Sequence, residues 1–145
     1  MERHLILRVV TRLLVGPILL FALYVQFHGE YGAGGGFQAG VIGSVAFILY
    51  GTVFSLSDLR RRVPDWAIHR LMAFGALLYA GTGIVTMVRG GAYLDYDRLG
   101  DVPAKAQQLG IIVIELGVGL TVFSVMVAIY YAFAGRPPRI DNDDW

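Results

Sequence analysis

One acidic residue interrupts an otherwise apolar run near the end of the sequence. Glu115 is the single charged residue of residues 109–133. A charged side chain at the centre of a membrane helix costs about 2.5–3.5 kcal/mol, and such groups usually face a bundle interior or a wet cavity. Three roles stay open for Glu115: a proton or cation site, an ion pair with a basic group of this chain or a neighbour, and a neutral hydrogen-bonded group.

A glycine-rich stretch at residues 28–37, HGEYGAGGGF, is the second candidate for chemistry. Glycine permits positive φ and close backbone approach, so the stretch is either a flexible turn or irregular backbone that lines a polar cavity. Histidine is the side chain that most often changes charge at physiological pH, which makes His28 a candidate, and Glu30 is acidic. Both therefore join Glu115 as candidates for an ion path, with a structural hydrogen bond as the alternative for His28.

Other kinds of site are excluded by what the sequence lacks. It has no cysteine, which rules out disulfides, thiolate nucleophiles and iron–sulfur clusters within the chain. It has no G-x-G-x-x-G motif after a strand, no G-K-[ST], no H-E-x-x-H and no Ser–His–Asp constellation. Its three histidines fall on separate segments. We therefore expect no enzyme activity, no cofactor and no stable metal site.

The composition indicates a membrane protein. Hydrophobic residues make up 56% of the 145 residues and charged residues 16%, too few charges to cover a soluble domain of this size. The apolar residues gather in four runs of about 20 residues, the length that crosses a bilayer as a helix. We expect a single all-α membrane domain over residues 1–145, with transmembrane helices at about 9–27, 37–56, 71–88 and 109–133 and a polar tail at 134–145.

The basic residues predict an orientation for these four helices. With four spans, the N-terminus, the loop at 57–70 and the C-terminus share one side, and the loops at 28–36 and 89–108 share the other. The first side carries nine of the twelve basic residues: Arg3, Arg8, Arg12, Arg60, Arg61, Arg62, Arg70, Arg136 and Arg139. The positive-inside rule then predicts cytoplasmic termini, a basic cytoplasmic loop, a glycine-rich outer loop and a longer outer loop. The Arg60–Arg62 run marks topology beside anionic lipid and is not a nucleic-acid site.

Two predicted helices carry stripes of small residues at a spacing that lets helix backbones approach closely. One stripe comprises Gly36, Gly40, Ser44 and Gly51, and the other Gly117, Thr121, Ser124 and Ala128. Packing within the chain and an interface with a partner are equally compatible with them.

Two motifs carry a family resemblance. The segment His28-Gly29 … Gly34-Gly35-Gly36-Phe37 … Gly40 resembles the H-G-x-x-x-P-G-G-G-F-x-x-G signature of the MnhB family, small subunits of the multi-subunit Na+/H+ antiporter of the Mrp or Mnh type, with Ala33 where that signature has proline. The segment Glu115–Val122, ELGVGLTV, is similar to the last-helix motif of the same family. The resemblance covers nearly the whole chain.

The resemblance implies a hetero-oligomeric complex in the cell membrane that exchanges cytoplasmic Na+ for external H+ and serves pH homeostasis. It implies partner subunits, among them two large ones that resemble the proton-pumping subunits of respiratory complex I, and it implies that this small subunit has no turnover of its own. It carries function over to Glu115, Gly34, Gly35, Gly36 and Phe37.

These residues lead to a specific hypothesis for ion exchange. Burial favours the neutral form of a carboxyl group, so Glu115 would hold either a proton or a transient Na+. The carbonyl oxygens of Gly34–Gly36 would suit a hard cation, and Phe37 would wall the cavity. Three alternatives remain: a purely structural subunit of the same complex, a subunit of a related membrane-bound hydrogenase, and a self-sufficient homo-oligomeric transporter.

Overall fold

The computed structural model of the chain describes residues 2–29 and 34–136, and these residues are helical almost throughout. Four helices are long and apolar enough to cross a membrane, which confirms an all-helical membrane architecture with four candidate spans. They are α1 (Glu2–His28), α2 (Gly36–Phe54), α4 (Asp65–Val88) and α5 (Pro103–Ala134). The short helices α3 (Leu56–Arg62) and η1 (Tyr96–Leu99) lie in the connections.

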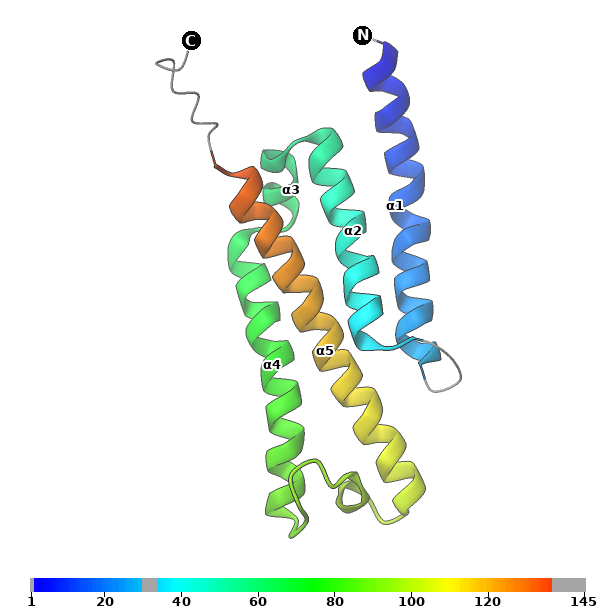
Figure 1. Ribbon diagram of the computed structural model, residues 1–145, viewed down its shortest axis with the longest axis vertical. Helices are drawn as coiled ribbons and strands as arrows, with labels where there is room; N and C mark the ends of the chain where they lie inside the picture. Colours follow the sequence, from blue (N-terminus) through cyan, green and yellow to red (C-terminus); the bar gives the residue numbers. More distant parts are fainter. Residues whose placement is uncertain (1, 30–33, 137–145) are drawn as a thin grey trace, which may run out of the picture.

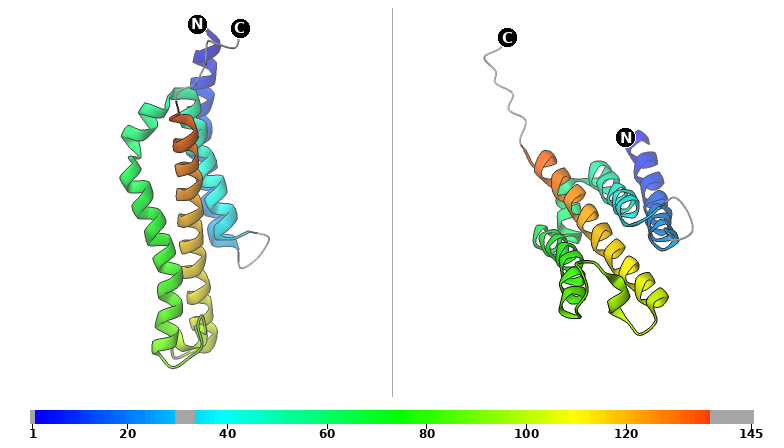
Figure 2. Two further views of the ribbon diagram at one scale, coloured as in Figure 1. Left: turned by 60° about the vertical axis from the view of Figure 1, so that its left-hand side comes forward. Right: turned by 60° about the horizontal axis from the view of Figure 1, so that its bottom comes forward.

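The long helices form a row in the order α4, α5, α2, α1 (Figures 1 and 2). Each long helix runs antiparallel to the one before it in the chain, so α1 begins and α5 ends at the same end of the molecule. Helix α5 packs against both α2 and α4, whereas α1 packs mainly on α2. As a result, α1 and α4 expose long apolar faces, with Leu13 and Leu77 both more than two-thirds exposed.

The long helices differ in length from the predicted spans. Helices α1, α4 and α5 begin earlier than the predicted residues 9, 71 and 109 and include the polar sequence before them. A helix does not have to begin at the edge of an apolar run. Helix α2 ends at Phe54, before the predicted residue 56, because Ser55 caps a new helix: its hydroxyl accepts a hydrogen bond from Asp58 N at 3.2 Å. The basic connection is therefore itself helical, as α3.

Small residues let α2 and α5 meet backbone to backbone. A Cβ on Gly36 would overlap the carbonyl group of Glu115, and a Cβ on Gly40 would stand 2.6 Å from the carbonyl oxygen of Gly119. Ser44, on the same stripe, is completely buried. The stripe on α2 therefore packs within the chain.

The second stripe, on α5, faces α4. A Cβ on Gly75 would stand 2.6 Å from the carbonyl oxygen of Gly117. The hydroxyl of Thr121 donates a hydrogen bond to that same oxygen at 2.8 Å. Both stripes thus serve the packing of the four helices on one another.

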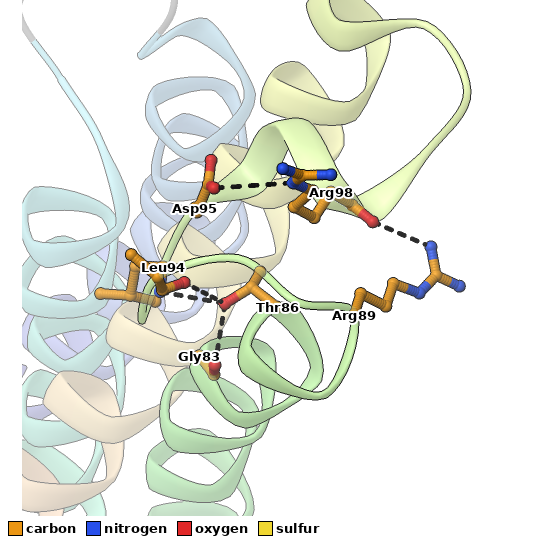
Figure 3. Close-up of polar contacts among 7 residues, drawn as sticks. Gly83, Thr86, Arg89, Leu94, Asp95 and Arg98 are labelled. Carbon is orange, nitrogen blue, oxygen red and sulfur yellow. Dashed lines mark hydrogen bonds and ion pairs between the residues drawn. The ribbon is translucent and has the colours of Figure 1, made fainter.

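The connection from α4 to α5 is built around Thr86 and Arg89 (Figure 3). The buried hydroxyl of Thr86 accepts a hydrogen bond from Leu94 N at 3.0 Å and lies 2.8 Å from the carbonyl oxygen of Gly83, to which it donates. Leu94 has a φ of 64°. Arg89 Nη1 donates to the carbonyl oxygen of Leu99 at 2.8 Å. Burial, and then the neighbouring Tyr79 and Tyr93, raise the pKa of the Tyr96 phenol, so this group stays protonated.

Candidate functional site

The Glu115 side chain lies against the glycines that connect α1 to α2. It is half-buried and belongs to the first half of α5. A Cβ on Gly29 and a Cβ on Gly35 would each stand 3.1 Å from Glu115 Oε1. Glycine at both positions therefore leaves the room that the carboxylate occupies.

The start of α2 is shaped for this approach. Gly35 is buried, precedes the helix and has a φ of 155°, a conformation that L side chains rarely adopt. Its carbonyl oxygen accepts the first hydrogen bond of α2, from Ala39 N at 3.0 Å. The next residue, Gly36, sits directly on the backbone of Glu115. Glu115 is thus held between the positive N-terminal end of α2 and the negative C-terminal end of α1.

Two further oxygen atoms lie near the same two glycines, Gly29 and Gly35. The carbonyl oxygen of Gly34 stands 3.1 Å from the Cβ position of Gly29, the same point that Glu115 Oε1 approaches. The side-chain oxygen of Gln38 stands 3.7 Å from the Cβ position of Gly35. Oxygen ligands are those that hard cations such as Na+ prefer.

Gln26 is a neighbouring polar residue that the sequence motifs did not single out. Its side chain is only 8% exposed, and its oxygen stands 2.6 Å from the Cβ position of Gly119, one turn along α5 from Glu115. The signal was present in the sequence, because Gln26 is a lone polar residue late in the apolar run at 9–27. Gln38 and Gly29 were likewise not predicted as site residues.

The other predicted site residues are distributed unevenly. Gly35 and Gly36 lie against Glu115, whereas the Cβ position of Gly34 faces Val25. His28 is exposed at the end of α1, where its ring stacks on Tyr24 with centroids 4.8 Å apart. Phe37 is 59% exposed, with its side chain at the surface of the isolated chain. Glu30 lies outside the described residues.

This arrangement suits reversible ion binding better than tight metal binding. Among the side chains that the structure describes, those of residues 5–29 and 34–136, no group of three from His, Cys, Asp and Glu could hold a metal ion. A single carboxylate with carbonyl and amide oxygens in its neighbourhood has the donor chemistry of a proton or of a weakly held monovalent cation.

Comparison with known proteins agrees with both the architecture and the motifs. Residues 6–128 match the family described as "Domain related to MnhB subunit of Na+/H+ antiporter". The chain is 36% identical over 141 residues to a Staphylococcus haemolyticus protein named "Putative antiporter subunit mnhB2", with 92% of this chain and 96% of that protein covered. A Staphylococcus aureus (strain Newman) protein of the same name is 36% identical over 138 residues, with the same coverage. The chain therefore belongs to the MnhB family of Na+/H+ antiporter subunits.

Proposed function

We propose that this subunit contributes to the cation path of its antiporter complex, and that Glu115 exchanges a proton for Na+ there. The observation that carries the proposal is the fit of the Glu115 carboxylate against Gly29 and Gly35, with the Gly34 carbonyl oxygen also close to Gly29. The complex would exchange cytoplasmic Na+ for external H+. Its other subunits, including large ones that resemble complex I subunits, would supply the rest of the path.

The depth of Glu115 supports this role. Several arginines at one end of the molecule lie over aromatic rings, among them Arg60 over Tyr131 at 5.2 Å and Arg70 over Trp66 at 4.7 Å. Such a belt is typical of a membrane interface. Glu115 lies ~24 Å along α5 from Tyr131, at a rise of ~1.5 Å per residue. If the belt marks one edge of a hydrocarbon core of about 30 Å, the carboxylate would lie just inside the opposite edge, within reach of protons and water.

The same belt supports an orientation. The arginine-rich end, where α1 begins and α5 ends, is the cytoplasmic end in this proposal, and the cell membrane is the location. The glycine connection and the loop after α4 then lie toward the outside. External protons would reach Glu115 over a short distance, whereas cytoplasmic Na+ would need a path across most of the membrane, which other subunits would line.

A structural role is the second candidate, and one contact favours it. Gly36 lies directly on the backbone of Glu115, so the ELGVGLTV segment also packs α5 on α2. A subunit that serves assembly alone, in an antiporter or in a related hydrogenase-type complex, would need this packing and not the carboxylate.

The test uses the complete complex in membrane vesicles, with wild-type subunit, Glu115→Gln and Glu115→Ala. We expect both variants to assemble on native gels and to lose most of the Na+-driven pH change. Normal exchange by both assembled variants would contradict the proposal. Loss of assembly by Glu115→Gln, whose amide has the shape of the carboxyl group, would favour the structural role.

A further inference from the structure

Three arginines converge on a pair of stacked rings at the basic end of the molecule. The rings of Tyr50 and Phe54 stack with centroids 4.5 Å apart. The guanidinium carbons of Arg8 and Arg12, from α1, lie 5.8 and 5.1 Å from the centroid of Phe54. That of Arg62, from α3, lies 5.4 Å from the centroid of Tyr50. Helices α1 and α3 thus bring three positive charges to one place on α2.

These charges have no acidic partner among the described side chains. The ion pairs found among the described side chains join Arg60 to Asp65 and Arg98 to Asp95. The aromatic faces attract the guanidinium groups, but they carry no net charge to offset the repulsion between the arginines. An anion placed among the three would offset it.

An apolar cavity opens directly below the arginines. It has a volume of about 170 Å³ and lies between α1, α2 and the end of α3; its lining is Val15, Ala46, Phe47, Tyr50, Leu59, Arg62 and Val63. Phe47 also lines a second cavity of about 360 Å³, which continues between α1, α2 and α5 as far as Gln26. The two cavities share Phe47 and both lie against α1, so we refer to them together as the groove; Arg62 stands at its basic end, the mouth, and the rest of its lining is almost entirely apolar.

We propose that this groove binds one anionic phospholipid. Its phosphate lies among Arg8, Arg12 and Arg62, and an acyl chain lies in the cavity that Val15 and Phe47 line. The charge of the mouth fits a phosphate, and the apolar lining below fits a hydrocarbon chain. The basic end also carries exposed Trp66, a residue typical of the headgroup level, so the mouth lies where a headgroup would be.

The test is native mass spectrometry of the 145-residue chain in detergent, with dioleoyl phosphatidylglycerol or dioleoyl phosphatidylcholine as the probe. The triple variant Arg8→Gln/Arg12→Gln/Arg62→Gln removes the mouth, and Arg61→Gln/Arg70→Gln/Arg136→Gln is the matched control with the same net charge. Each basic group near an anionic lipid contributes a factor of about five. We expect the mouth variant to lose about tenfold or more of its phosphatidylglycerol binding and the control to lose less than half. Equal losses in both variants would overturn the proposal.

A second pair of variants tests the acyl chain separately from the phosphate. Val15→Phe fills the cavity and leaves the arginines in place, whereas Leu13→Phe adds the same ring on the exposed side of α1. We expect Val15→Phe alone to reduce phosphatidylglycerol retention, and excess inorganic phosphate not to displace the lipid. Displacement by inorganic phosphate would show that the arginines bind free phosphate only. Equal retention by the two variants would show that the cavity holds no acyl chain, and either result would overturn the proposal.

Discussion

Helix α5 meets its two neighbours by the same packing device but with different chemistry. On one side, Gly36 of α2 lies on the backbone of Glu115, and on the other, Gly75 of α4 lies on the backbone of Gly117. Both contacts bring helix backbones together through glycine. Only the α2 side adds a carboxylate, held against Gly29 and Gly35. The glycines explain the close approach of the helices on both sides of α5. They do not explain why a carboxyl group stands at position 115, because packing alone does not require one.

The largest expected effect is common to both sides. Gly36→Ala and Gly75→Ala each place a Cβ where backbone atoms of α5 stand, which cannot relax as a flexible side chain would. We expect each to destabilise the chain by about 3 kcal/mol and to reduce the folded fraction in a thermal unfolding assay. Gly81→Ala, with open space around its Cβ position inside α4, is the control and should be at least as stable as the wild type. Wild-type stability of Gly36→Ala would show that α2 and α5 do not meet backbone to backbone at this point.

The next effect should distinguish the two sides. Glu115→Gln keeps the volume of the side chain and removes its charge, whereas Thr121→Val removes the hydroxyl that donates to the Gly117 carbonyl oxygen on the α4 side. We expect the first to lose at least tenfold of the Na+-driven exchange per assembled complex and the second to retain it. Equal losses of exchange in the two variants would mean that the loss comes from disturbed helix packing and not from the missing carboxylate.

A smaller effect concerns Gly35, compared with Gly90. Both glycines have positive φ, 155° and 81°, so alanine strains the backbone at both, by about 1–3 kcal/mol. Only at Gly35 does the new Cβ approach Glu115 Oε1. We expect Gly35→Ala to raise the Na+ concentration for half-maximal exchange several-fold, and Gly90→Ala to leave it unchanged. A similar rise in both would assign the effect to strain.

The smallest effect is expected far from the site, in the connection after α4. Thr86→Val removes the hydroxyl that accepts from Leu94 N and leaves that partly buried amide without its partner. A lost buried hydrogen bond costs about 1–3 kcal/mol. We expect a lower unfolding temperature with normal exchange. Impaired exchange in this variant would couple the loop to the ion path and weaken the contrast between the two sides of α5.

Much of the architecture could be predicted from the sequence because membrane helices have simple sequence patterns. Apolar runs of about 20 residues and spaced small residues directly reflect a bilayer's thickness and close helix packing. The helix ends could not be predicted as well. Helices α1, α4 and α5 include polar sequence outside the apolar runs, and Ser55 separates α2 from the short helix α3. Their ends depend on caps and connections, which the apolar pattern does not record.

The candidate site was predictable only in part. Glu115 was evident because a charge in a membrane helix costs free energy, and the glycines were evident because they are concentrated in residues 28–37. Their contact, however, joins residues that lie far apart in the sequence. The pairing of Gly29 and Gly35 with one oxygen, and the nearness of Gln26 and Gln38, depend on how α1, α2 and α5 pack. A motif gives the residues but not these distances.

The role of Glu115 is tested most directly by infrared difference spectroscopy of the purified complex on addition of Na+. If Glu115 exchanges a proton for Na+, the C=O stretch of a protonated carboxyl group should be lost and a carboxylate band should appear. We predict this change in the wild type and in Thr121→Val, and its absence in Glu115→Gln. The same change, undiminished in Glu115→Gln, would show that another carboxyl group exchanges the proton and would contradict the role proposed for Glu115.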